Sequence, residues 1–255
     1  MKKIALATTV LSTLFAAGSA SAADLAARPY TKAPPPALAP IYNWTGFYIG
    51  VNGGGAWSDK CWDIYNDLGA PVVPAIREGC HTASGATVGG QVGYRWQASN
   101  WVFGLEAQGN WADLSGSNTS LAIFGATNRS RIDALGLFTG QVGYSWNNVL
   151  WYVKGGAAVT HDKYEGVVTG TGFVFDRADE TRWGGVVGTG LEFGFTPNWS
   201  LAIEYDHLFM GRRDIGLYLT ATPGVFSRGE TIRQDVDMVT ARINYRFGGP
   251  VVAKY

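Results

Sequence analysis

The sequence predicts an all-β fold: an eight-stranded, antiparallel, up-and-down transmembrane β-barrel. Three observations predict it. Apolar and polar residues alternate along paired segments, the same hairpin pattern returns about every 50 residues, and aromatic residues stand about ten positions apart along single segments. Together these features are typical of strands that cross a membrane in a closed barrel, with one face toward lipid and the other toward the lumen.

The alternation is clearest in residues 89–111. Val92, Tyr94 and Trp96 are apolar, whereas the residues between them are polar or small. A short polar turn follows, and the alternation resumes from Trp101 onward. Because successive side chains of a strand leave opposite faces, a period of two indicates two strands joined as a hairpin.

The hairpin pattern recurs along the chain. The strand ends Trp96, Trp146, Phe195 and Phe247 are about 50 residues apart. A fixed period of this length indicates a repeated unit, and a β-propeller blade is the alternative. A blade contains about four short strands, whereas each period here holds two longer strands, a short turn and a longer connection. The repeat therefore favours the meander of an outer-membrane barrel.

Aromatic residues mark two levels of the predicted barrel. Phe47 and Trp57 stand ten residues apart, as do Trp101 and Trp111. Ten residues that rise about 3.3 Å each and are tilted by about 40° span roughly 25 Å, the height of the apolar band of such a barrel. We therefore expect an aromatic girdle at both membrane interfaces, formed by Trp57, Trp96, Trp101, Trp111, Trp146, Trp151, Phe195, Trp199 and Phe247.

The composition fits this fold and argues against other classes. Only 16% of the 255 residues are charged, glycine is frequent with 35 residues, and the formal net charge is zero. This balance gives no indication of binding to nucleic acid. After the N-terminal segment no apolar run reaches about 18 residues, so a mature transmembrane helix is not expected.

The N-terminal residues predict export. Residues 1–22 carry two lysines, then an apolar stretch, and end in Ala-Ser-Ala, which together predict a secretory signal peptide. A short membrane anchor is the alternative, but the apolar run is too short to span a bilayer comfortably. Residues 23–43 are rich in proline and predict an extended periplasmic tail before the first strand.

The barrel is expected to occupy residues 44–248, followed by a C-terminal extension at residues 249–255. Eight strands leave three short turns, which should face the periplasm, and four long loops, which should face the outside. These loops are expected near residues 57–84, 113–128, 162–179 and 211–231.

Both cysteines, Cys61 and Cys80, fall in the first predicted loop. An export signal places them in an oxidising compartment, so we expect a disulfide between them. A thiol redox role is less consistent with the sequence because the two cysteines do not form a C-x-x-C pair. A metal site with His81 is a further alternative, but three scattered ligands in one loop are a weak pattern, and no metal is expected.

The polar face of the strands predicts a charged lumen. The interior of an eight-stranded barrel is about filled by side chains, and charges buried there must be paired. Both signs occur in similar numbers, so we expect a salt-bridged plug, with a selective pore lining as the alternative. Glycines on this face leave some room for a narrow water-filled path, whereas a wide porin channel is not expected. The expected network comprises Arg95, Glu106, Lys154, Glu192, Glu204, Arg242 and Arg246.

No catalytic constellation is recognisable. A hydrolase needs a nucleophile, a base and an orienting group in one place. The three histidines, His81, His161 and His207, show no such pattern. We therefore expect no catalytic, cofactor-binding or metal-binding site and do not expect an enzyme.

Several segments carry a family resemblance. The signal sequence, the Ala-Asp-Leu that follows it, the proline-rich tail, NWTGFYIGVNGGG at residues 43–55 and INYRFGGPVVAKY at residues 243–255 resemble the small porin-like outer-membrane proteins of alphaproteobacteria, often called outer-membrane immunogenic proteins. The repeated GQVGYxW turns strengthen the likeness, which covers essentially the whole chain. It implies an eight-stranded outer-membrane barrel that supports envelope integrity, and some members are described as porin-like or haemin-binding.

Two functions remain open. The first is a structural barrel whose loops contact lipopolysaccharide or host surfaces, and we favour it. The second is a small-solute pore or a haemin receptor, for which Tyr65, His81 and Tyr164 are the candidate loop ligands. In most barrels of this type the barrel assembly machinery reads a C-terminal aromatic residue, and Phe247 and Tyr255 are both candidates here.

Overall fold

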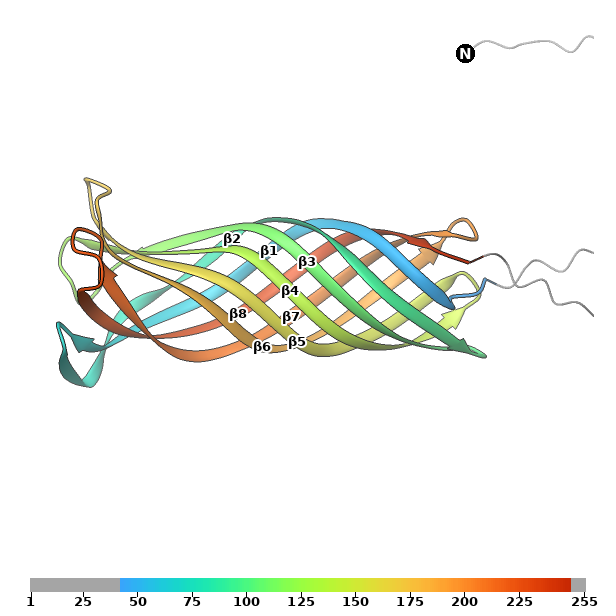
Figure 1. The fold of residues 1–255 in the computed structure, drawn as a ribbon, viewed down its shortest axis with the longest axis horizontal. Helices are drawn as coiled ribbons and strands as arrows, with labels where there is room; N and C mark the ends of the chain where they lie inside the picture. Colours follow the sequence, from blue (N-terminus) through green and yellow to red (C-terminus); the bar gives the residue numbers. More distant parts are fainter. Residues whose placement is uncertain (1–41, 249–255) are drawn as a thin grey trace, which may run out of the picture. The chain divides into compact units, whose positions relative to one another are not determined.

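The computed structural model describes residues 42–248, which form a closed barrel of eight antiparallel strands (Figure 1). Each strand pairs with its neighbours in sequence, and β8 pairs with β1 to close the ring. The predicted fold class is therefore confirmed. The strands are β1 (Gly46–Asp67), β2 (Ala70–Ala98), β3 (Trp101–Thr119), β4 (Ala126–Trp146), β5 (Val149–Val168), β6 (Val174–Gly194), β7 (Trp199–Leu219) and β8 (Phe226–Arg246).

The predicted signal peptide at residues 1–22 and the predicted extension at residues 249–255 lie outside the described residues. The same holds for the predicted tail at residues 23–43, except for its last two positions. Among residues 42–248 there is no helix whose length and apolar character would let it cross a membrane.

The strands are tilted around the barrel with a stagger of ten residues. A row of directly paired residues starts on β1 at Tyr48, passes through all eight strands and returns to β1 at Ser58, and 58 − 48 = 10. With a rise of about 3.3 Å per residue and about 4.8 Å between strands, this stagger gives a tilt of about 40°. Ten residues along such a strand therefore rise roughly 25 Å.

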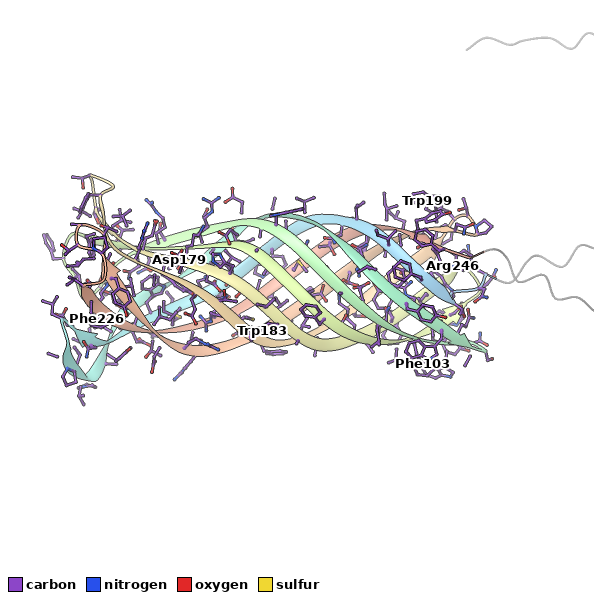
Figure 2. All side chains as sticks on the ribbon, in the orientation of Figure 1. Phe103, Asp179, Trp183, Trp199, Phe226 and Arg246 are labelled. Carbon is purple, nitrogen blue, oxygen red and sulfur yellow. A yellow bond between two sulfur atoms is a disulfide. The ribbon has the colours of Figure 1, made fainter. Side chains whose placement is uncertain are left out.

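One end of the barrel, here called the terminal end, holds the start of β1, the end of β8 and the three short turns; the opposite end is the distal end (Figure 1). In the half next to the terminal end, outward residues such as Ile49 and Val51 are apolar and exposed by 50% and 63%. Phe103 and Trp199 lie near the terminal end and Trp183 near the middle (Figure 2). An exposed apolar belt of this extent fits hydrocarbon, so this half is the membrane-spanning band.

The expected girdle residues lie on the outer face at the two limits of this band. Because the strands are tilted, a row of paired residues shifts along the barrel by slightly more than one residue from each strand to the next. With this shift, Trp57 and Trp111 lie at one level near the middle of the barrel. Trp183 and Phe209, which are not among the predicted girdle residues, lie at the same level on β6 and β7. The expected girdle residues at the terminal limit are all exposed: Trp96, Trp101, Trp146, Trp151, Phe195, Trp199 and Phe247.

The distal half shows the reverse pattern. Many of its outward residues are charged or polar, as in the ion pairs Arg131–Asp113 at 3.0 Å and Lys163–Asp133 at 2.6 Å. Its inward residues include a buried apolar cluster around Trp62, together with buried polar groups such as the Lys60–Asp162 ion pair. This half therefore resembles a water-soluble barrel with its own core, standing beyond the band.

The segments predicted as long loops are strands for most of their length, and that prediction was wrong. β1 and β2 are joined by a turn at Leu68 and Gly69, both with positive φ, rather than by a loop over residues 57–84. The other three connections shrink to residues 120–125, 169–173 and 220–225. The error arose because these segments place polar side chains outside and apolar ones inside.

The expected disulfide between Cys61 and Cys80 is present. The two cysteines are direct partners in the register of β1 and β2. The disulfide therefore links two adjacent long strands within the distal half instead of closing a loop.

The backbone ladder of the distal half is interrupted at one place. Residues 178–184 of β6 and 210–217 of β7 have no ladder pairing with each other, although the two strands pair on either side of this stretch. The buried guanidinium of Arg182 donates to the carbonyl oxygens of Gly211 at 3.0 Å and Ile232 at 3.2 Å. Backbone groups in hydrocarbon must all be paired, so it is consistent that the interruption lies beyond the band.

Candidate functional site in the barrel lumen

Charged side chains fill the lumen of the membrane-spanning band. They come from six different strands, and each alternates in sequence with residues that face lipid, so the period of two places them inside. All are at most 6% exposed: Arg95, Glu106, Lys154, Glu192, Glu204 and Arg242.

Five of the lumen residues form what we call the central network: Glu106, Lys154, Glu204, Asp206 and Arg242. Arg242 bridges two carboxylates, with its Nη2 at 2.7 Å from Oε1 of Glu106 and its Nη1 donating to Oε2 of Glu204. The Nζ of Lys154 lies 2.6 Å from Oε1 of Glu204 and 3.1 Å from Oδ1 of Asp206. Two cations thus face three carboxylates out of contact with water.

Two buried tyrosines complete the central network. The hydroxyls of Tyr48 and Tyr152 donate hydrogen bonds of 2.6 and 2.5 Å to its carboxylates. Their rings lie against inward glycines: a Cβ added at Gly93 would come 2.5 Å from the ring of Tyr48, and one at Gly190 would come 2.4 Å from the ring of Tyr152. The room that inward glycines were expected to leave is therefore occupied by phenol rings at these two positions.

A second ion pair lies nearer the terminal end. The Nη1 of Arg95 is 2.8 Å from Oε2 of Glu192. The same guanidinium lies 4.4 Å from the ring centroid of Tyr48, 5.5 Å from that of Tyr152 and 5.9 Å from that of Trp44. Cation–π contacts strengthen when they are shielded from water. The ion pair with Glu192 and the three aromatic rings together fix the position of Arg95.

Trp44 closes the terminal mouth of the lumen. Its side chain is 1% exposed, and its indole N–H donates to Oγ of Ser145 at 3.1 Å. Arg246 was expected in the charged network but lies at this mouth, where its guanidinium donates to the carbonyl oxygens of Thr45 at 3.0 Å and Pro197 at 2.5 Å. Among residues 42–248 it has no carboxylate in ion-pair contact. The strand pattern does not predict Trp44 as a lumen residue, because Trp44 precedes the first strand.

Apolar and polar layers alternate above the central network. An apolar layer comes first, and its buried members include Leu114, Leu137, Leu208 and Met238. Lys60 and Asp162 follow as a buried ion pair at 2.7 Å, and a second apolar cluster lies beyond them around Trp62, Ile215 and Ile232.

Near the terminal mouth, a cavity between Trp44, Arg95 and Glu192 measures about 10 Å³, which is at the lower limit for a single water molecule.

A third buried charge cluster lies close to the distal end. Arg228 faces three carboxylates, with Glu78 at 2.8 Å, Asp176 at 3.0 Å and Glu230 at 3.4 Å. Burial, together with the neighbouring charge of Glu78, raises the pKa of the Glu230 carboxyl to about 9. Glu230 is therefore a neutral acid at pH 7, and the cluster keeps one proton.

The candidate haemin ligands are not loop residues. Tyr164 is fully buried on β5, and Tyr65 and His81 lie on β1 and β2. Both ring nitrogens of His81 are engaged, by Asn118 at 2.7 Å and Ser130 at 3.0 Å. Across the described part of the chain, no group of three or more His, Cys, Asp or Glu side chains is arranged to hold a metal ion.

Comparison with known proteins places this barrel. The sequence matches the outer membrane protein beta-barrel domain over residues 8–247. It is 27% identical over 221 residues to the 31 kDa outer-membrane immunogenic protein of Brucella melitensis, which covers 84% of this chain and 90% of the relative. It is 25% identical over 215 residues to the 25 kDa outer-membrane immunogenic protein of Brucella abortus, with 84% of each chain covered.

Solved structures share the architecture. The outer membrane protein OprG of Pseudomonas aeruginosa superimposes with a TM-score of 0.50 at 13% identity, covering 81% of this chain and 100% of that one. The outer membrane protease OmpT of Escherichia coli gives 0.50 at 11% identity, covering 82% and 99%. At these identities the likeness shows the fold alone. The resemblance inferred from the sequence is confirmed, and the chain, an outer-membrane protein, belongs to the outer membrane protein beta-barrel domain family.

Proposed function

We propose that this outer-membrane barrel is a structural protein that supports envelope integrity, with its lumen closed by paired charges. The observation that carries the proposal is the filling of the lumen at membrane level. Arg242, Lys154 and their carboxylates are buried in the lumen, and two phenol rings fill space beside them. Ion pairs of this kind add little net stability compared with an apolar core, but they bar free solute.

The apolar layer above the central network supports the same function. A conducting path needs polar groups or water along its whole length, because an ion in an apolar constriction loses its hydration. Leu114, Leu137, Leu208 and Met238 interrupt any such path directly above the charges. The charged lining is therefore a closed plug rather than a selectivity filter.

The proposal implies partners on both sides of the membrane. Short turns of such barrels face the periplasm, which directs the distal half outward, toward lipopolysaccharide and host surfaces. For the barrel assembly machinery we propose Phe247 as the signal, since it is exposed directly after β8 and its ring lies 5.7 Å from that of Phe47. Tyr255, the other candidate, lies outside the described residues.

We also infer that the barrel is not an enzyme. Its two histidine–carboxylate pairs, His161–Asp133 at 2.6 Å and His207–Asp237 at 2.7 Å, face outward near the limit of the band. The protease among the similar structures shares only the fold at 11% identity. The haemin alternative is not favoured either, because Tyr164 is fully buried and both ring nitrogens of His81 are already hydrogen-bonded.

Planar-bilayer recording tests the closed lumen. The folded barrel should give no discrete conductance steps under conditions in which a porin, reconstituted in parallel, gives regular steps. Folding is checked by the shift in gel migration on heating. Steady, ion-selective steps from protein that migrates as folded barrel would contradict the proposal and favour the small-solute pore.

A second experiment separates the two functions in cells. A strain without the protein should admit more of a hydrophobic fluorescent dye, because its envelope is weakened, while its uptake of small hydrophilic solutes stays unchanged. Slower uptake of hydrophilic solutes with an intact dye barrier indicates a channel. Titration of the purified barrel with haemin should show no saturable change in the haem absorption band.

A further inference from the structure

Two arginines face each other on the outer surface just beyond the membrane-spanning band. Arg212 of β7 is the direct register partner of Arg233 of β8, and both side chains are exposed. Directly opposed side chains in an antiparallel pair have Cβ atoms about 5 Å apart, so two like charges there destabilise the sheet. An anion bound between the two guanidinium groups would offset their repulsion.

Neighbouring carboxylates do not supply this anion. Arg233 has Asp235 at 3.7 Å, close to the limit of an ion pair, and Arg212 has no carboxylate within 4 Å among residues 42–248. Other exposed arginines of the distal half are better matched: Arg131 lies 3.0 Å from an aspartate, and Arg213 lies 3.4 Å from a glutamate. An anion that offsets the charge of the opposed pair must therefore come from outside the described part of the chain.

The height of the pair identifies the surroundings. Phe209 belongs to the aromatic level that limits the band, and Arg212 follows three residues later on the same strand. Three residues at this tilt rise roughly 7 Å. The polar headgroup region of a bilayer is about 5–8 Å deep on each side of the hydrocarbon. Both guanidinium groups therefore lie at the level of the lipid headgroups.

We propose that Arg212 and Arg233 bind a phosphate group of the phosphorylated glycolipid in the outer leaflet. A guanidinium presents a planar fork of N–H donors that fits phosphate oxygens in pairs, and one phosphate between two such forks satisfies both. Arg233 is also the register partner of Cys61, so the disulfide-linked β1–β2 hairpin supports its strand from the other side. This inference rests on the proposed function, in which the barrel contacts lipopolysaccharide, and it names the contact.

The test measures the binding of bisphosphorylated lipid A to the folded, detergent-solubilised full-length barrel. The variant R212Q/R233Q removes the opposed pair. The control R77Q/R129Q removes the same amount of charge from two exposed arginines that lie farther from the band and are register partners of Asp63 and Glu165 instead of another arginine. We expect Kd to rise about tenfold or more in R212Q/R233Q, as for the loss of a charge-assisted hydrogen bond, and to change less than about twofold in the control.

Further arms identify the ligand chemistry. Lipid A stripped of its phosphates should bind to the wild type and to R212Q/R233Q equally, and R212K/R233K should recover part of the lost affinity. An unchanged Kd in R212Q/R233Q, or an equal loss in the control, overturns the site. Inorganic phosphate that binds as tightly as lipid A also overturns it, because the site would then be a general anion site.

The inference and the proposed function fail separately. A barrel that conducts no ions but binds lipid A equally well with and without the arginine pair refutes this site and leaves the structural function standing. A barrel that conducts ions and loses lipid A binding in R212Q/R233Q refutes the structural function and leaves the site standing.

Discussion

Replacing Arg242 with methionine is the most direct perturbation of the lumen. The substitution keeps an unbranched side chain but removes the guanidinium that bridges Glu106 and Glu204. Neither carboxylate can reach water in place of the lost partner, because both are at most 6% exposed. The variant therefore leaves buried negative charge that nothing nearby offsets.

The size of the effect follows from the charges of the central network. With all five groups ionised the network carries 2 − 3 = −1, and R242M makes this 1 − 3 = −2. Removal of one partner of a buried ion pair costs about 3–5 kcal/mol of unfolding free energy. Adding Glu106→Gln restores 1 − 2 = −1, so the double variant should lose less than the sum of the single losses, by about 1.5–3 kcal/mol.

Urea unfolding of the barrel in lipid vesicles measures these differences, followed by the fluorescence of its ten tryptophans. Arg131→Met is the matched control, because the Arg131–Asp113 pair lies on the surface with its side chains 54% and 72% exposed. This control should lose no more than about 1 kcal/mol. The reasoning fails if R242M is as stable as the control, or if the losses from R242M and E106Q simply add.

Three further outcomes can be measured on the same preparation. Ile203→Arg, on the lipid face at mid-band, should lower the free energy of unfolding by about 2–4 kcal/mol, whereas Tyr218→Arg on the same strand beyond the band should have little effect; equal yields of heat-modifiable protein from the two variants would contradict the assigned band. Glu230 holds its proton up to a pKa of about 9 in the fold, against 4.5 for an ordinary glutamate, so its stabilising contribution is complete below about pH 4.5 and is lost as the pH rises through 9. Glu230→Gln should therefore flatten the decline in urea midpoint between about pH 5 and 9, and an unchanged slope would show that Glu230 is already ionised at neutral pH. C61S/C80S opens a cross-link between residues 19 apart and should lower stability by up to about 3 kcal/mol; a urea midpoint that is the same with and without reductant in the wild type would assign the disulfide no stabilising role.

The membrane-spanning half could be predicted because lipid imposes one pattern on every strand. Ile49 and Val51 face hydrocarbon, and Tyr48 and Asn52 alternate with them inside. Any strand in this environment repeats that pattern, so strand number and the inward or outward direction of each side chain follow from the sequence. The aromatic spacing gives the height of the band.

The distal half keeps the same period but exchanges the two faces. On β8, Ile232 and Val236 point inward, whereas Arg233 and Asp235 point outward. A strand pattern that requires apolar outward residues excludes these charged positions, so they resemble a loop in the sequence. A search that allows the apolar phase to switch by one residue at Asp237 would have extended this strand.

The partners within the lumen could not be predicted from local pattern. Glu106 and Arg242 come from β3 and β8 and meet only because the barrel closes with a stagger of ten residues. No short stretch of sequence encodes that stagger. Arg246 shows the consequence: its inward direction was predicted, but its height on β8 places it at the mouth, with carbonyl oxygens instead of carboxylates.

The interrupted pairing between β6 and β7 marks the part of the barrel wall that should open most easily. Amide protons in residues 178–184 and 210–217 have a neighbouring strand to bond on one side only, so they should exchange with deuterium before those of the surrounding wall. Thermal opening would then begin above the bilayer and admit water, while the hydrocarbon-facing ring stays sealed. Local opening of the distal half and a closed membrane-spanning band can thus occur together in one continuous sheet.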